Sequence, residues 1–131
     1  MYMLDTNICI YVLNHRTDKL RNKFKVTPDL CISAVTHAEL QFGIENGKAS
    51  LRKERREQLS LFTRRLQVFP VGAEVGSLYG RVRADLKSSG EMIGGNDLFI
   101  AAHALSEGAV LVSNNLRVFG RVRGLKVENW V

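Results

Sequence analysis

Cysteine and proline are scarce in this chain of 131 residues, which contains only two of each. Cys9 and Cys31 lie in apolar stretches, without a CxxC pair or a third type of metal ligand nearby. We therefore expect buried, reduced thiols rather than a disulfide framework, as is usual in the cytoplasm. No flexible linker or low-complexity tract appears, and the length is sufficient for a core without staples, so we expect residues 1–131 to form a single domain.

Long apolar runs and several nucleotide- and acyl-binding motifs are also missing. No stretch approaches the roughly 18 apolar residues that a membrane helix needs. The N-terminus lacks a basic segment, and Asp5 stands where a signal peptide would become apolar, so we expect a cytoplasmic protein without membrane contact. A glycine-rich loop ending in GK[ST] and a GxSxG turn are both absent. Their absence disfavours NTP-driven and acyl-transfer chemistry.

Positive charge is in excess, with 19 Lys and Arg against 13 Asp and Glu, for a net charge of +6. This balance fits a polyanion such as RNA or DNA, although a basic surface that only keeps the protein soluble would also explain it. One basic cluster lies on the predicted helix at 51–66, where interleaved glutamates favour a solvated face. The other lies near the C-terminus and is predicted to hold nucleic-acid phosphates; it comprises Arg117, Arg121, Arg123 and Lys126.

Short apolar runs alternate with helical patterns along the whole chain. We expect strands near residues 2–4, 30–32, 68–69, 109–112 and 126–130. Helices are expected near 8–13, 18–25, 33–45, 51–66, 73–89 and 97–107. This alternation predicts an α/β fold with a mostly parallel central sheet.

Three acidic residues stand at or near places where an apolar run gives way to a helix: Asp5, Glu39 and Asp97. Strand ends of a parallel sheet open onto one edge, where ligands usually bind. Two unit charges about 4 Å apart repel by roughly 4 kcal/mol at an effective dielectric of 20. Three carboxylates gathered there therefore favour a cation, and an all-oxygen site suits Mg²⁺ or Mn²⁺ better than Zn²⁺.

Each acid also has a purely structural interpretation. Asp5 and Asp97 are as well suited to capping helices. Glu39 shares a helical face with Val35 and Phe42, so we expect it to be buried on an apolar stripe and paired with either an arginine or a metal. Thr6, Asn7 and Ser33 are expected either to orient carboxylates, water or phosphate, or to serve as caps. His103, on an apolar helix, is predicted to be a core histidine rather than a ligand.

Four segments together resemble the signature blocks of the PIN domain, in particular the VapC toxins of bacterial VapBC toxin–antitoxin modules: MLDTNICIYVLN, ISAVTHAEL, GGNDLFIAAHAL and LVSNNLRVFGRV. The resemblance implies a three-layer fold and a Mg²⁺- or Mn²⁺-dependent endoribonuclease that halts translation. Many such toxins cut initiator tRNA in the anticodon stem-loop and others cut different tRNAs or ribosomal RNA, so the resemblance favours tRNA as the substrate without fixing which RNA is cut. It also implies a homodimer that forms a larger assembly with a VapB-type antitoxin, whose C-terminal segment would cover the active site.

Residue by residue, Asp5, Glu39 and Asp97 match the three main catalytic, metal-binding acids of that family. Thr6 matches a position that is often Thr or Ser. The fourth acidic position departs from the pattern, because Asn115 and Val118 stand where relatives carry an acid. An amide oxygen of Asn115 is expected to replace that ligand, so the sequence predicts one metal and leaves a second open.

Two other functions and one further surface stay open at this point. A Mg²⁺-dependent phosphatase or phospho-receiver domain would want a lysine in a late strand-end turn, which the chain lacks. A non-catalytic nucleic-acid-binding module would use the acids only as caps and ion pairs. Four apolar residues are candidates for an antitoxin groove, although core positions are favoured for most of them: Ile10, Tyr11, Leu20 and Phe24.

Overall fold

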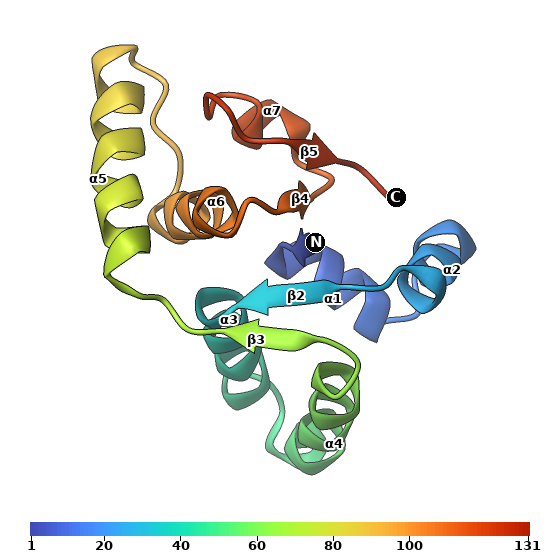
Figure 1. The fold of residues 1–131 in the computed structure, drawn as a ribbon. Helices are drawn as coiled ribbons and strands as arrows, with labels where there is room; N and C mark the ends of the chain where they lie inside the picture. The colour runs from blue at the N-terminus through green and yellow to red at the C-terminus, as the bar shows by residue number, and fades with distance from the viewer.

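Strands and helices alternate throughout the computed structural model, which describes residues 1–131 (Figure 1). The strands are β1 (Tyr2–Leu4), β2 (Leu30–Ser33), β3 (Gln67–Phe69), β4 (Val110–Val112) and β5 (Val127–Glu128). The helices are α1 (Thr6–Leu13), α2 (Asp18–Val26), α3 (Ala34–Glu45), α4 (Arg52–Thr63), α5 (Ala73–Ser88), α6 (Gly95–Glu107) and α7 (Leu116–Phe119), with a 3₁₀ turn at Ala49–Leu51.

The five strands form one sheet in the order β3-β2-β1-β4-β5, and every neighbouring pair is parallel. In Figure 1 the β2 and β3 arrows run side by side in the same direction. The predicted α/β class and mostly parallel sheet are therefore confirmed. From β1 the chain moves outward to β2 and β3, and then returns to the other side of β1 as β4. Such a reversal of strand order opens a crevice at the carboxyl ends of the strands.

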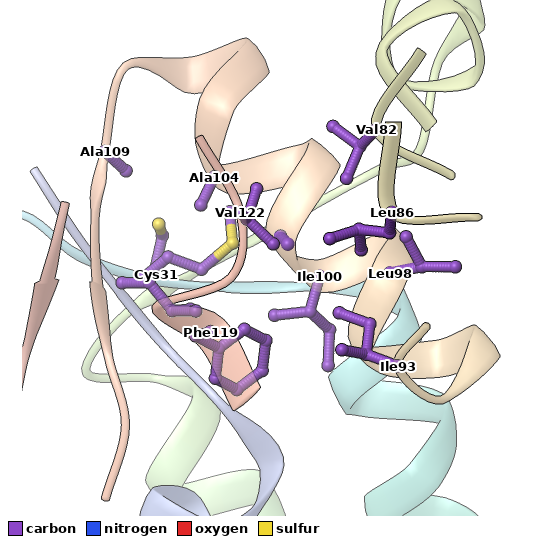
Figure 2. Close-up of a cluster of buried hydrophobic side chains, with 13 residues drawn as sticks. Cys31, Val82, Leu86, Ile93, Leu98, Ile100, Ala104, Ala109, Phe119 and Val122 are labelled. Atoms are coloured by element: carbon purple, nitrogen blue, oxygen red, sulfur yellow. The ribbon is translucent and has the colours of Figure 1, made fainter. Parts of the chain in front are cut away.

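Two hydrophobic cores cover the two faces of the sheet and make three layers. Successive strand residues point to opposite faces, so Met3 joins one core while Leu4 joins the other. The first core draws on α5, α6 and α7, and Figure 2 shows Cys31 of β2 in the same cluster as Phe119 and Ile100. The second core draws on α1 to α4. The inner strands β1, β2 and β4 are buried on both faces, and their sequences are therefore continuous apolar runs, whereas the edge strand β3 is largely exposed.

Element boundaries differ from the sequence expectation in two places. The helix predicted at 51–66 is instead a 3₁₀ turn followed by α4, which ends at Thr63 so that the chain can enter β3. The four-residue α7 was not predicted, because one turn is too short for a periodic pattern. The apolar α6 ends as expected at Gly108, whose φ of 62° closes the helix in the left-handed conformation. None of the helices combines the length and the apolarity of a membrane-crossing segment.

Candidate active site

Asp5 lies at the carboxyl end of the central strand β1 and caps the next helix. Its Oδ1 accepts a hydrogen bond from the Ile8 N–H at 2.9 Å, and its own N–H donates to the Val112 carbonyl at 3.0 Å. The side chain is buried, with 4% of the residue exposed. Because the cap occupies only one of the two carboxylate oxygens, the capping and ligand-binding interpretations of Asp5 are compatible.

The three predicted acids are close enough for their charges to interact. Burial is the main cause that raises the pKa of Asp5, and the charges of Asp97 and Glu39 raise it further. Hydrogen bonds from Ser113 and from the Ile8 N–H oppose this shift. The pKa of Asp97 is likewise raised, first by burial and then by the charge of Glu39. The structure therefore brings together acids that lie far apart in the sequence.

Glu39 is held by a hydroxyl rather than by an arginine. The Thr6 hydroxyl donates to Glu39 Oε1 at 2.6 Å and lies 3.3 Å from the Thr36 hydroxyl oxygen. The ion pairs of the structure do not include Glu39. Its second carboxylate oxygen has no hydrogen-bond partner in the protein, so it stays free for a ligand.

The expectation that Glu39 belongs to a buried apolar stripe is wrong. Phe42 on the same face is 67% exposed, and Glu39 itself is half-buried. The face of α3 that packs into the core carries Thr36, Leu40 and Ile44 instead. Of the apolar neighbours of Glu39, Val35 is partly buried against the first core and Phe42 is on the surface, and both line a cavity that is also lined by Thr6 and Asn7.

Asp97 stands in the first turn of α6 and not at its cap, which is Gly94. A polar cavity of about 430 Å³ lies in front of it, lined by Glu39, Gly94, Gly95, Asn96 and Asp97. The amide groups of a first helical turn favour a negative charge nearby. Small residues at Gly94 and Gly95 leave room for a ligand to approach the backbone, because neither has a neighbour against which a side chain would clash.

Ser113 is a site residue that sequence reasoning missed. It is fully buried at the end of β4, beside β1, and its side chain lowers the pKa of Asp5. Its hydroxyl oxygen also accepts the Asn115 N–H at 2.9 Å. A signal was available, since Ser113 directly follows β4 as Asp5 directly follows β1. Sequence alone does not reveal that these two strands are neighbours.

The remaining supporting residues are placed differently from one another. Asn115 is half-buried and precedes α7, without a side-chain cap bond. Asn7 is exposed at the start of α1. Ser33 caps α3 by accepting the Val35 N–H at 3.1 Å, and its other partner is His103, so it contacts none of the three acids. Whether these residues serve the site stays a prediction.

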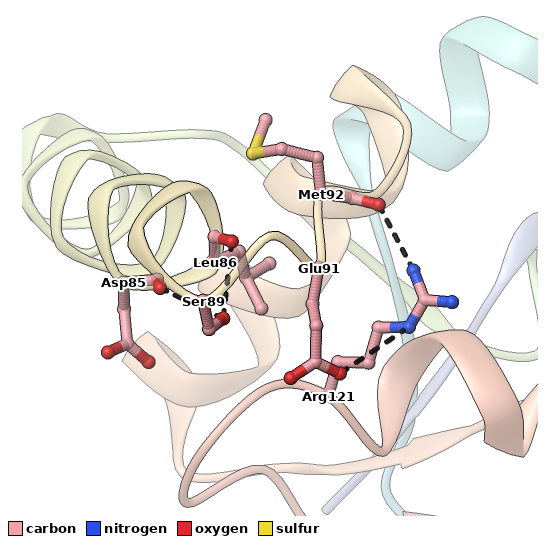
Figure 3. Close-up of polar contacts among 6 residues, drawn as sticks. All are labelled: Asp85, Leu86, Ser89, Glu91, Met92 and Arg121. Carbon is pink, nitrogen blue, oxygen red and sulfur yellow. Dashed lines mark hydrogen bonds and ion pairs between the residues drawn. The ribbon is translucent and has the colours of Figure 1, made fainter.

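The C-terminal arginines have partners of their own. Arg121 donates to the Met92 carbonyl at 3.1 Å and lies 4.0 Å from Glu91, so it holds the segment between α5 and α6 (Figure 3). Arg123 lies 4.0 Å from Asp85. Arg117 is exposed and forms no ion pair. None of the three lines a cavity that contains Glu39 or Asp97, so their contact with nucleic acid stays a prediction.

A groove leads away from Glu39 between α1, α3 and α4. Its first part is lined by Glu39, Ile10, Leu40 and Arg55, and its continuation toward α2 by Phe24 and Arg65 among others. The two parts are neighbours, because Leu13 and Gln58 line both of them. Of the residues considered for an antitoxin groove, Ile10 and Phe24 line it, whereas Leu20 is fully buried in the core.

The donor set at the acids suits a hard cation. No three His, Cys, Asp or Glu side chains stand close enough to hold a metal ion without moving. The three carboxylates nevertheless offer only oxygen atoms, which Mg²⁺ and Mn²⁺ prefer. Burial is the main cause that raises the pKa values of Asp5 and Asp97, and the repulsion between the acids, which raises them further, is the kind that a divalent cation relieves. The residues present therefore fit such an ion.

Comparison with known proteins gives consistent matches over the whole chain. The PIN domain family model matches residues 2–125. Ribonuclease VapC2 of Haemophilus influenzae is 42% identical over 99% of this chain and 98% of its own length. The tRNA(fMet)-specific endonuclease VapC of Salmonella typhimurium is 38% identical, with 98% and 97% covered. The crystal structure of DNA-bound VapBC from Salmonella typhimurium superposes with a TM-score of 0.93 at 36% identity, covering 99% of this chain and 98% of that one.

Proposed function

The chain belongs to the PIN-domain family and, within it, to the VapC ribonucleases, and from that premise we propose that it is a divalent-metal-dependent endoribonuclease. The observation that carries the proposal is the meeting of Asp5, Glu39 and Asp97 at the carboxyl edge of the sheet, where their charges affect one another. We propose that residues 1–131 act as one nuclease domain in the cytoplasm.

The three carboxylates would hold a Mg²⁺ or Mn²⁺ ion, which in such sites activates a water molecule and stabilises charge on a phosphate. Asp5 would offer the oxygen that its helix cap leaves free. The Thr6 hydroxyl would orient Glu39 through its hydrogen bond, and Ser113 would help to hold Asp5 in its charged form. Asp97 faces the polar cavity at the start of α6, which would receive the scissile phosphate. Asn115 is proposed as a further oxygen donor.

The substrate is proposed to be tRNA, and its cleavage would halt translation. The support for tRNA is the name of the Salmonella relative, a tRNA(fMet)-specific endonuclease at 38% identity. The net charge of +6 favours any RNA equally. Initiator tRNA, cut in the anticodon stem-loop, is therefore the first substrate to test.

The partner is proposed to be a VapB-type antitoxin that occupies the groove between α1, α2, α3 and α4. Solved relatives are VapBC complexes, among them that of Salmonella typhimurium. The groove pairs an apolar floor, including Leu40 and Phe62, with a basic rim that includes Arg55 and Arg65. An amphipathic acidic segment would fit it and would end beside Glu39. A homodimer of the toxin is also proposed, and light scattering of the purified protein would measure it.

Cleavage of total bacterial RNA by the isolated chain tests the proposed function. Reactions contain Mg²⁺, Mn²⁺ or EDTA, and Asp97→Asn serves as the matched inactive protein. Loss of a residue that hydrogen-bonds to a metal ligand typically costs about 10- to 100-fold, so loss of the ligand itself should cost more than about 100-fold. Discrete fragments present only with wild type and metal would support the nuclease, and mapping of their ends would name the RNA.

Equal rates of cleavage by wild type and Asp97→Asn would show that the three carboxylates do not form the catalytic site. Intact RNA in every reaction, from protein with a native circular dichroism spectrum, would favour the non-catalytic nucleic-acid-binding module. A filter-binding measurement with the same RNA would then distinguish that module from an inert protein.

A further inference from the structure

His103 is a fully buried polar residue that the proposed function does not use. It lies on α6 with none of its surface exposed, and its Nδ1 is 2.8 Å from the hydroxyl oxygen of Ser33, the residue that caps α3. Its Nε2 has no hydrogen-bond partner and lies 3.9 Å from Glu107 Oε1. The sequence prediction of a core histidine is confirmed. A buried polar ring with one unpaired nitrogen still calls for an explanation.

The hydrogen-bond partners determine which ring nitrogen carries the proton. The Ser33 hydroxyl has one hydrogen, and its oxygen already accepts the Val35 N–H at 3.1 Å. If Nδ1 carried the proton, the Ser33 hydrogen would lack an acceptor and a bare Nε2 would face the Glu107 carboxylate. If Nε2 carries it, Nδ1 accepts the Ser33 hydrogen and the Nε2–H points toward Glu107. The second arrangement gives the Ser33 hydrogen an acceptor and leaves only the Nε2–H without a hydrogen-bond partner, at 3.9 Å from a carboxylate of favourable charge.

The ring is held in its neutral form by its surroundings. Burial lowers the pKa of His103, and the nearby charge of Glu107 only partly offsets this effect. A neutral ring protonated at Nε2 completes an ordered chain from the Val35 N–H through the Ser33 hydroxyl to His103. This chain ties the first turn of α3 to the middle of α6 inside the protein.

The tie joins the two helices that carry Glu39 and Asp97. Ser33 precedes Glu39 on α3, and His103 follows Asp97 on α6, each by about one and a half helical turns, or roughly 9 Å. A shift of one helix against the other at this point therefore changes the separation of the two carboxylates. Misplacement of a reacting group by about 1 Å can cost about 100-fold in rate.

We propose that His103 is a positioning residue for the nuclease site: through its bond to Ser33 it sets the separation of Glu39 from Asp97. The inference rests on the proposed function, because the two acids matter only if they act together. His103 itself does not contact either acid, so it acts through the placement of α3 against α6.

Four variants separate positioning from simple packing. His103→Leu keeps the bulk and removes both nitrogens. His103→Asn restores an acceptor oxygen where Nδ1 lies, whereas His103→Gln places its polar atoms nearer to Nε2. The fourth variant, Leu86→Ala, is the matched control, because Leu86 is 1% exposed in the core that α6 shares with α5 but is not part of the tie. Each is assayed for kcat, KM and Tm with the RNA that wild type cleaves.

The expected result is a fall in kcat of about tenfold or more for His103→Leu with KM little changed, since the acids but not the RNA contacts are displaced. His103→Asn should recover most of kcat and His103→Gln should not. Leu86→Ala should have a lower Tm than wild type but an unchanged kcat at a temperature at which it is folded. Equal kcat for His103→Leu and Leu86→Ala, or no recovery in folded His103→Asn, would overturn the proposal.

Nitrogen NMR of wild type tests the tie independently of activity. The ¹⁵N shifts of His103 should show an unprotonated Nδ1 and a protonated Nε2, and Ser33→Ala should perturb the Nδ1 signal. A protonated Nδ1 would overturn the proposal even if His103→Leu failed to fold. Wild type that cleaves no RNA but shows the expected tautomer would remove the proposed function and, with it, the positioning role. The two failures are thus distinguishable.

Discussion

Asp5 and Asp97 each weaken the fold while they are charged. Burial and the neighbouring carboxylates raise the pKa of both, so the folded protein binds their protons more tightly than the unfolded chain does. The stability that protonated Asp97 contributes is fully present below its ordinary pKa of 3.8 and is lost as pH rises through the higher folded-state pKa. The folded protein is therefore less stable with these carboxylates charged than with them protonated.

Asp97→Asn should consequently be more stable than wild type at neutral pH in the presence of EDTA, by a few degrees in Tm. The amide removes the cost of burying a charge and, secondarily, the repulsion with Glu39, and it does not titrate. The difference in unfolding free energy between the two proteins should grow as pH rises from about 4 and should then level off. Urea unfolding between pH 4 and pH 8 measures it. A constant difference in unfolding free energy across this range would show that the charged Asp97 carboxylate does not destabilise the fold.

Thr6 should matter through its hydroxyl alone. Its bond to Glu39 at 2.6 Å fixes that carboxylate, and a hydrogen bond to a charged group is worth about 1.5–3 kcal/mol. Thr6→Val, which keeps the shape, should lower kcat by about tenfold or more, while Thr6→Ser should keep most of it. Steady-state cleavage of the same RNA compares them. Equal rates for the two variants would show that Glu39 needs no such support.

Elements built from local patterns were predictable, and those that depend on exposure or on distant neighbours were not. The apolar runs of β1, β2 and β4 follow from burial on both faces. The environment of Glu39 was misjudged, because a face carrying Val35 and Phe42 predicts burial whether or not another element covers it. In the folded protein no element covers Phe42.

Arg121 should stabilise the connection from α5 to α6. It donates to the Met92 carbonyl at 3.1 Å and is 27% exposed at its side chain, so its removal should cost about 1 kcal/mol. Arg121→Ala should speed hydrogen exchange at residues 89–93, just before the glycines that line the acid cavity. Arg123→Ala is the matched control, because its side chain is 88% exposed. If both variants exchange alike, the Arg121 contacts are not stabilising.

At the scale of the whole molecule, a divalent cation should act as a structural ligand. An ion that binds only the folded protein stabilises it by about 2.7 kcal/mol at a hundredfold excess over its Kd, which is roughly 10 °C in Tm for a chain of this size. Mg²⁺ or Mn²⁺ should produce such a rise in wild type and a much smaller one in Asp5→Asn. Differential scanning calorimetry measures both. Equal shifts in the two proteins would place the ion elsewhere.

The assembled site was predictable only as a set of three acids. The sequence identified the three acids, and the expected parallel sheet predicted that they would lie together at one edge. The residues that position these acids were not predictable from the sequence. Ser113 approaches Asp5, and Ser33 contacts His103, only when segments that are distant in the sequence become neighbours in the fold. A serine is also too common to be singled out by its type.

The position of β1 in the sheet determines how late in synthesis the acid site can assemble. It is the first strand to be synthesised, yet it is the middle strand, and one of its two neighbours is β4, near the other end of the chain. Roughly a hundred residues separate them, about 5–20 s of translation at about 5–20 residues per second. Until β4 emerges from the ribosome, Asp5 has no Ser113 and the sheet edge is incomplete. Each new copy therefore lacks the assembled acid site for most of its own synthesis, and the antitoxin that we propose has that interval in which to be present before the site forms.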